Sequence, residues 1–196
     1  MTLIGITGGI GSGKTTVSNL LQELGYFVYN ADTEARHLQQ NDETVRRQII
    51  GLFGSEIYDT SNTLNRSLLA RIVFNDVEKL QQLSDIVHPA VKNDFEKWVA
   101  KHTNEKILFM ESAILFESGF YRLFDKIIAI TASEETRIKR VTHRDNITRE
   151  QILERMARQL PEKDLLAHVD FIIRTDNDEQ TLKETVEQLL VVCGKK

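Results

Sequence analysis

The sequence predicts an α/β fold with a five-stranded parallel sheet, and three observations carry this prediction. Short apolar runs with β-branched residues recur along the chain, and such runs are typical of buried strands. Segments of helical periodicity separate these runs. The first two runs, 2–7 and 26–30, flank a helical segment, and a βαβ order favours parallel pairing.

The first strand is predicted at "TLIGIT" (2–7), which ends at glycines. Helical spacing follows over 14–24, with Val17, Leu20 and Leu21 on one face, and Gly25 is a typical residue after a helix end. "YFVYN" (26–30) is the second predicted strand. Together these elements form one βαβ unit.

The region from 32 to about 100 is mostly helical in pattern, as in "ETVRRQIIGLF" and "RSLLARIVF". We expect one helix to end at the step from His88 to Pro89, because a residue before proline disfavours the α region. Three further strands are predicted at 106–110, 126–131 and 169–175. Helical segments are expected over 133–160 and 179–192.

Composition limits the classes of function. The chain has 196 residues, a net charge of −4 and no basic run, which argues against nucleic-acid binding through bulk electrostatics. The single cysteine, Cys193, cannot form an internal disulfide and favours a reducing compartment. No apolar run approaches the roughly 18 residues that span a bilayer. We therefore expect a cytoplasmic protein without a membrane partner; the sequence does not indicate its oligomeric state.

"GITGGIGSGKTT" (5–16) contains the pattern G-x-x-x-x-G-K-[ST] between a predicted strand and a predicted helix. In that context the backbone N–H groups and the helix N-terminus hold the phosphates of a nucleotide. Lys14 is placed to reach the β- and γ-phosphates, and the Thr15 hydroxyl is placed to bind Mg²⁺. ATP and Mg²⁺ are thus the expected ligands. The candidate binding residues are Gly8, Gly9, Gly11, Ser12, Gly13, Lys14, Thr15 and Thr16.

Three reaction classes share such a loop: small-molecule kinases, GTPase switches, and ATPase motors or chaperones. A GTPase needs an N-K-x-D segment that reads guanine, and the sequence contains none. A motor is usually a larger or ring-forming chain. A kinase predicts an acid near the acceptor hydroxyl and a mobile, arginine-rich lid.

Two acids follow predicted strands. Asp32 follows the second strand, where it can activate a hydroxyl, help to hold Mg²⁺ through water, or cap the next helix. Glu111 follows the third strand, where it is either a Walker-B-like residue near the metal-bound water or an ordinary loop carboxylate. Ligands of open α/β sheets bind at this carboxyl edge.

An arginine block follows the fourth predicted strand. Arg140 and Arg144 are four residues apart and share a helix face, so both can close over a transferring phosphoryl group. The alternative is a solvated charged helix, which is favoured for most of the block. His88 is a candidate ligand for substrate phosphate or a residue at a helix end. The block comprises Arg137, Arg140, Arg144, Arg149, Arg155 and Arg158.

The ordered set of motifs resembles the dephospho-coenzyme A kinase family over nearly the whole chain. The phosphate loop is followed by "NAD" (30–32), "NRSLLARIVFND" (65–76), "VHPAV" (87–91), "LFE" (115–117) and the arginine block. The resemblance implies a P-loop NTPase-type three-layer fold and ATP-dependent phosphorylation of the ribose 3′-hydroxyl of dephospho-coenzyme A. It places the catalytic aspartate at Asp32, the lid arginines at Arg140 and Arg144, and the acceptor region at His88.

The resemblance also implies three parts: a nucleotide-binding core (about 1–31, 105–133 and 168–196), a helical substrate domain (about 32–104) and a lid (about 134–167). Three departures stand out. Asn30 replaces a supporting carboxylate, Glu111 replaces an aspartate in a segment that also lacks the usual proline, and 175–177 reads Thr-Asp-Asn. The rival interpretations are a kinase for another small acceptor, such as a nucleoside or nucleotide, and a non-catalytic nucleotide-binding module.

Overall fold

The structure is a computed structural model that describes residues 1–74, 76–176 and 178–194. The chain divides into two compact units. The first contains residues 1–30 and 103–196, and the second contains residues 31–102. Asn177 of the Thr-Asp-Asn segment lies outside the described residues.

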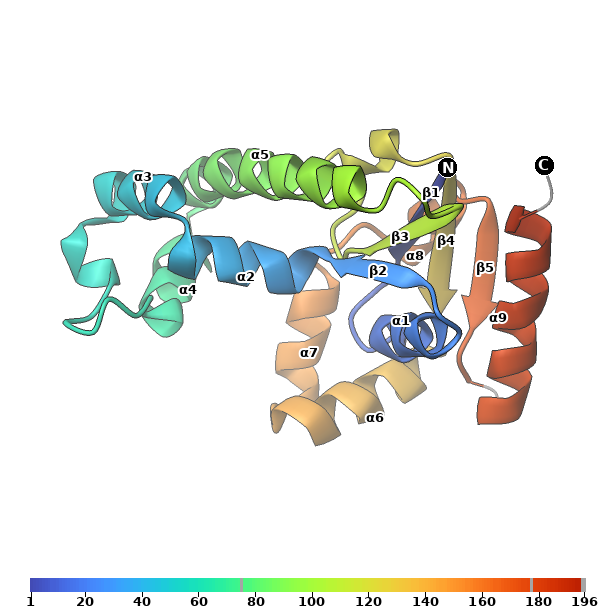
Figure 1. Cartoon of the computed structure of the whole chain (residues 1–196). Helices are drawn as coiled ribbons and strands as arrows, with labels where there is room; N and C mark the ends of the chain where they lie inside the picture. The colour runs from blue at the N-terminus through green and yellow to red at the C-terminus, as the bar shows by residue number, and fades with distance from the viewer. Residues whose placement is uncertain (75, 177, 195–196) are drawn as a thin grey trace. The chain divides into compact units, whose positions relative to one another are not determined.

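The first unit is built on a five-stranded parallel sheet in the order β2-β3-β1-β4-β5, so the predicted fold class is confirmed (Figure 1). The predicted first and fourth strands have the observed bounds, and the other three differ by one or two residues at one or both ends. The strands are β1 (Thr2–Thr7), β2 (Phe27–Asn30), β3 (Ile107–Glu111), β4 (Lys126–Thr131) and β5 (Phe171–Arg174).

Two helices of the first unit, α1 and α9, bury apolar faces against this sheet. Ile4, Phe109 and Ile128 have no exposed surface, and Leu21 of α1 and Val186 of α9 belong to the same core. Burial on this scale is the main favourable term in folding. The helices are α1 (Lys14–Glu23), α6 (Glu134–Asp145), α7 (Arg149–Met156), α8 (Glu162–Leu166) and α9 (Glu179–Gly194), with a 3₁₀ turn at Phe120–Leu123.

The second unit is helical, as its sequence periodicity predicts, and has a core of its own. Ile49 and Ile57 have no exposed surface, and Val45 and Leu69 pack with them. None of the described helices in either unit combines the length and apolar character needed to cross a membrane. The elements are α2 (Ala31–Asn41), α3 (Glu43–Phe53), a 3₁₀ turn (Ser55–Ile57), α4 (Arg66–Phe74) and α5 (Val77–Lys101).

The predicted helix end at His88–Pro89 is wrong, because Pro89 lies inside α5. A proline in a helix interior removes one backbone hydrogen bond and costs about 3 kcal/mol. The helix continues because its apolar face is buried on both sides of the proline, at Val87 before it and at Val91 and Phe95 after it. Tertiary packing against α2, α3 and α4 therefore outweighs the local penalty.

Candidate active site

The phosphate loop joins the end of β1 to the start of α1. It needs glycine where the backbone adopts a positive φ and where another part of the backbone comes too close for a side chain. Gly13, immediately before α1, has φ = +93°, a left-handed conformation that disfavours a side chain. A Cβ on Gly8 would lie 2.1 Å from the Ile130 carbonyl oxygen of β4. The glycines thus let the loop curl tightly over the carboxyl edge of the sheet and in front of a helix N-terminus.

Lys14 and Thr15 open α1 and face different partners. The Lys14 Nζ donates to the carbonyl oxygens of Gly8 (2.8 Å) and Gly9 (3.3 Å), so it lies across the loop. The Thr15 hydroxyl donates to Glu111 Oε1 at 3.3 Å. The predicted loop residues therefore surround one small region at the start of α1.

Glu111 is the last residue of β3 and is only 4% exposed. Its second oxygen, Oε2, accepts a hydrogen bond from Asn30 Nδ2 at 3.0 Å. Strand register explains this meeting, because Asn30 of β2 and Ile6 of β1 both pair with Glu111. An uncharged Asn30 can donate to the carboxylate, whereas an aspartate there would repel it.

The donors beside Thr15 suit a hard divalent cation. No group of three or more His, Cys, Asp or Glu residues in the described parts of the chain could hold a metal by itself. Mg²⁺ does not need such a cage, because it keeps several waters and uses one or two protein oxygens together with nucleotide phosphates. The Thr15 hydroxyl and the Glu111 carboxylate are oxygen ligands of that kind.

The structure brings both predicted lid arginines to the phosphate loop. Arg140 donates from Nη1 to Thr175 Oγ1 (2.8 Å) and from Nη2 to the Thr175 carbonyl oxygen (2.7 Å), and Nη1 also reaches the Gly11 carbonyl oxygen (3.4 Å). Arg144 lies one turn further along α6 and pairs with its neighbour Asp145 (Nε to Oδ1, 2.7 Å). Loop residues 11–16, Arg140, Val141 and Arg144 line one cavity of about 230 Å³.

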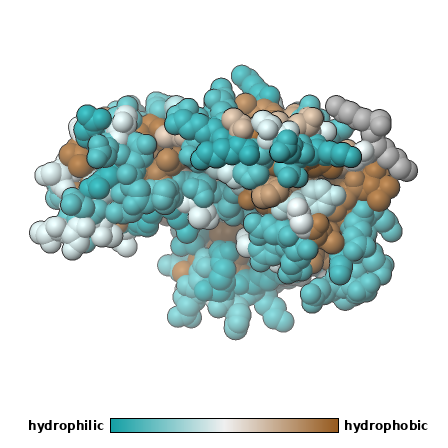
Figure 2. Space-filling model, viewed as in Figure 1, coloured by the Kyte–Doolittle hydropathy of each residue, from teal (hydrophilic) through white to brown (hydrophobic). Residues whose placement is uncertain are grey.

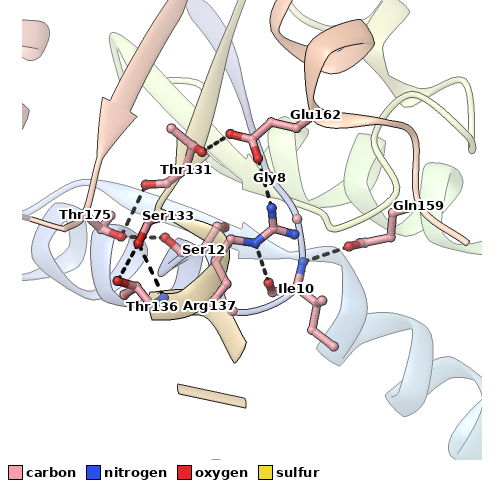
Figure 3. Close-up of polar contacts among 12 residues, drawn as sticks. Gly8, Ile10, Ser12, Thr131, Ser133, Thr136, Arg137, Gln159, Glu162 and Thr175 are labelled. Carbon is pink, nitrogen blue, oxygen red and sulfur yellow. Dashed lines mark hydrogen bonds and ion pairs between the residues drawn. The ribbon is translucent and has the colours of Figure 1, made fainter. Parts of the chain in front are cut away.

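Arg137 is a loop-supporting residue that was not predicted. Its side chain is 8% exposed, its Nε donates to the Ile10 carbonyl oxygen at 3.0 Å, and its Nη1 pairs with Glu162 Oε2 at 3.0 Å (Figure 3). Glu162 also accepts a hydrogen bond from Thr131. The sequence did contain a signal for this role. Arg137 precedes Val141 by four residues, which places both side chains on the inner face of α6.

Other arginines of the block fit the solvated-surface alternative. Arg149 pairs with Glu135 (2.6 Å), and Arg155 reaches Asp145 (3.4 Å), with exposed guanidinium groups. Figure 2 shows hydrophilic residues over α6 and α7. Surface pairs of this type contribute little to stability.

Asp32 and His88 both belong to the second unit. Asp32 is exposed in the first turn of α2, which begins at Ala31, so the helix-cap alternative is wrong. His88 lies inside α5, so the alternative that it marks a helix end is also wrong. Burial lowers the pKa of His88, and nearby Asp85 partly opposes this shift. The roles of both residues remain predictions.

Comparison with known proteins gives one consistent family. A family profile described as dephospho-CoA kinase matches residues 2–182. The dephospho-CoA kinase of Salinibacter ruber is 39% identical over 191 residues, which cover 96% of each protein. A crystal structure from Thermus thermophilus matches with a TM-score of 0.85 at 30% identity, covering 97% of each chain. The dephospho-CoA kinase of Campylobacter jejuni matches with a TM-score of 0.71 at 25% identity, covering 96% of this chain and 95% of that one.

Proposed function

The chain belongs to the dephospho-CoA kinase family, and we propose that it transfers the γ-phosphoryl group of ATP to the ribose 3′-hydroxyl of dephospho-coenzyme A. The products are coenzyme A and ADP, and the reaction completes coenzyme A synthesis. The observation that carries this proposal is the cavity that unites the phosphate loop with Arg140 and Arg144. Such a site suits phosphoryl transfer, in which positioning and charge stabilisation dominate catalysis.

The donor half of the reaction belongs to the first unit. The backbone N–H groups of residues 11–16 hold the β-phosphate, and Lys14 exchanges its carbonyl partners for β- and γ-phosphate oxygens. Thr15, with Glu111 through water, would hold Mg²⁺, which would neutralise charge on the phosphates. Arg140 and Arg144 stabilise the charge on the transferring group.

The acceptor half begins at Asp32, only two residues after Asn30 in the chain. Its carboxylate orients the 3′-hydroxyl and accepts its proton as the 3′-oxygen bonds to the γ-phosphorus. The bond from the γ-phosphorus to the β,γ-bridging oxygen breaks, and its electron pair leaves with ADP. The proton then passes from Asp32 to solvent. We assign His88 the role of binding a phosphate group of the acceptor substrate.

The same proposal divides the chain into a nucleotide-binding core, a substrate domain over about 32–104 and a lid over about 134–167. Bonds of Arg137, Arg140 and Gln159 to loop residues give the lid segment its contacts with the core. Closure of such a segment would exclude water and so limit ATP hydrolysis. The single cysteine is consistent with a cytoplasmic reaction.

An acceptor panel tests the proposal. ADP release is measured with Mg²⁺, ATP and one of dephospho-coenzyme A, adenosine, AMP or water alone. We expect ADP release to depend on dephospho-coenzyme A. Faster release with another acceptor would favour a different small-molecule kinase. Binding of ATP without acceptor-dependent ADP would favour a nucleotide-binding module.

A further inference from the structure

Asp32 and Arg36 occupy neighbouring positions on one face of α2. They are four residues apart, and both side chains are exposed. Residues at this spacing have Cβ atoms about 5–6 Å apart. Opposite charges at this spacing often pair, yet no ion pair joins Asp32 to Arg36 in the described part of the chain. Both groups therefore remain available to a ligand lying along this face.

Arg66 lies against the same helix at Arg36. It is the first residue of α4, and its Nη2 donates to the Arg36 carbonyl oxygen at 2.9 Å. Gln40 of α2 holds the segment before α4, donating to the Asn62 carbonyl oxygen (2.9 Å) and accepting from the Leu64 N–H (3.0 Å). These bonds hold the start of α4 beside α2. Contacts within the second unit therefore keep Arg66 close to Arg36.

A third guanidinium group lies near this pair. Arg46 packs over the Tyr58 ring, 4.8 Å from its centroid, and donates to Asn62 Oδ1 at 3.1 Å. Burial raises the pKa of Tyr58, while Arg46 and Arg66 both oppose that shift. Burial lowers the pKa of Arg66, and the charge of Arg36 lowers it further. Tyr58 thus lies within the electrostatic reach of two arginines.

No carboxylate in the described part of the chain neutralises this cluster. Among the described residues, none of Arg36, Arg46 and Arg66 has an acid within ion-pair distance. Like charges held close together without a counter-ion repel one another, and an anionic ligand removes that repulsion. Guanidinium forks match phosphate oxygens in particular.

We propose that Arg36 and Arg66, with Arg46 adding positive charge, bind the 5′-diphosphate of the acceptor nucleotide and so hold its 3′-hydroxyl at Asp32. This inference rests on the proposed function. The 3′-oxygen and the α-phosphorus lie at opposite ends of one ribose and are joined by a few covalent bonds. That reach is similar to the rise of about 6 Å along α2 between Asp32 and Arg36, which are four residues apart.

The subsite gives the enzyme a chemical basis for choosing its acceptor. A free nucleoside offers the same 3′-hydroxyl but has no anion for Arg36 and Arg66. Such an acceptor would be held by fewer contacts, and its hydroxyl would be poorly oriented at Asp32. The arginine cluster therefore acts on acceptor binding and leaves ATP binding to the phosphate loop.

The test compares Arg36→Gln and Arg66→Gln with the matched control Arg71→Gln, an exposed arginine further along α4. The KM for dephospho-coenzyme A and the KM for ATP are measured for each variant. We expect the acceptor KM to rise roughly tenfold or more for Arg36→Gln and Arg66→Gln. The ATP KM should change by less than about twofold, the control should match the parent protein, and Arg66→Lys should be milder than Arg66→Gln.

Each contrary outcome has a distinct meaning. If the parent protein makes no coenzyme A, the proposed function fails. If the parent is active but both glutamine variants keep their acceptor KM, or if the ATP KM rises equally, the diphosphate subsite is wrong. Thermal unfolding checks folding, because Arg66 also bonds to α2. If Arg66→Gln unfolds, the acceptor KM of Arg36→Gln tests the subsite instead. The Arg36 guanidinium has no partner among the described residues, so its replacement should not disturb folding.

Discussion

The hydroxyl of Thr15 lies 3.3 Å from Oε1 of Glu111, so the first turn of α1 is tied to the end of strand β3. Because Glu111 is buried and also accepts from Asn30, its carboxylate has a fixed orientation. A fixed carboxylate beside the threonine can receive hydrogen bonds from metal-bound water. This bond is the basis of the first prediction.

Replacing Glu111 with Gln should lower turnover by about 10²-fold and raise the Mg²⁺ concentration needed for half-maximal rate. The amide keeps the shape of the side chain but loses its charge. Steady-state rates across a Mg²⁺ titration check this, with Glu117→Gln as control, because Glu117 lies away from Thr15 and accepts from the Leu160 N–H. An unchanged Mg²⁺ dependence would remove Glu111 from the metal site.

Replacing Asp32 with Asn should leave ATP binding near normal while turnover falls by about 10²–10⁴-fold, the usual contribution of a general base. Calorimetric ATP binding and steady-state rates provide the two measurements. Glu34→Gln is the control, since Glu34 lies on the same helix and has only a 3.9 Å contact with His37. Equal loss of ATP binding and turnover would count against the base assignment.

Arg140 and Arg144 should separate in their effects on stability. Arg140→Gln loses three hydrogen bonds to the loop and Thr175, so both turnover and Tm should fall. Arg144→Gln loses only an exposed pair with Asp145, so turnover should fall at least about 10-fold while Tm changes little. Unaltered turnover of Arg144→Gln would exclude it from the site.

Gly9→Ala should destabilise the loop by about 1–3 kcal/mol, the usual effect of overpacking. The new Cβ would lie 2.1 Å from Arg137 Nη2, and bonds to Ile10 and Glu162 hold that guanidinium in place. Gly51→Ala in α3 is the control, because nothing lies within 4 Å and alanine favours the helix by roughly 0.5–1 kcal/mol. Denaturant unfolding measures both, and a neutral Gly9→Ala would show that Arg137 can move.

His88 should make stability sensitive to mild acid. Burial lowers its folded-state pKa below the unfolded value of about 6.5, so the unfolded chain binds more protons near that pH. The free energy of unfolding is therefore unaffected by His88 above its unfolded pKa. It decreases as pH falls from that value through the lower folded-state pKa. Replacing His88 with Gln should flatten the dependence between about pH 7 and pH 5. A His88→Gln slope equal to the parent's would contradict the account.

Much of the fold followed from local pattern. The strands at 2–7 and 126–131 were predicted with their observed bounds because each is centred on a short apolar stretch. Pro89 was misjudged because the packing that sustains α5 comes from helices distant in sequence. Local rules describe only the penalty at a proline, whereas the outcome depends on tertiary burial.

The candidate site was predictable where a motif has a mechanism, as at Lys14 and Thr15. The hydrogen bond from Asn30 to Glu111 depends on strand register, which no single segment contains. The role of Arg137 depends on Glu162, a partner that lies 25 residues further along the chain. Pairings of this kind require the assembled sheet and lid segment.

The most direct test of the central claim is product analysis of the protein incubated with ATP, Mg²⁺ and dephospho-coenzyme A, resolved by chromatography and mass. We expect coenzyme A and ADP to form in equal amounts, with the new phosphate on the ribose 3′-oxygen. ADP without coenzyme A would show that water or another acceptor receives the phosphoryl group. That result would contradict the assignment of Asp32 and of the acceptor.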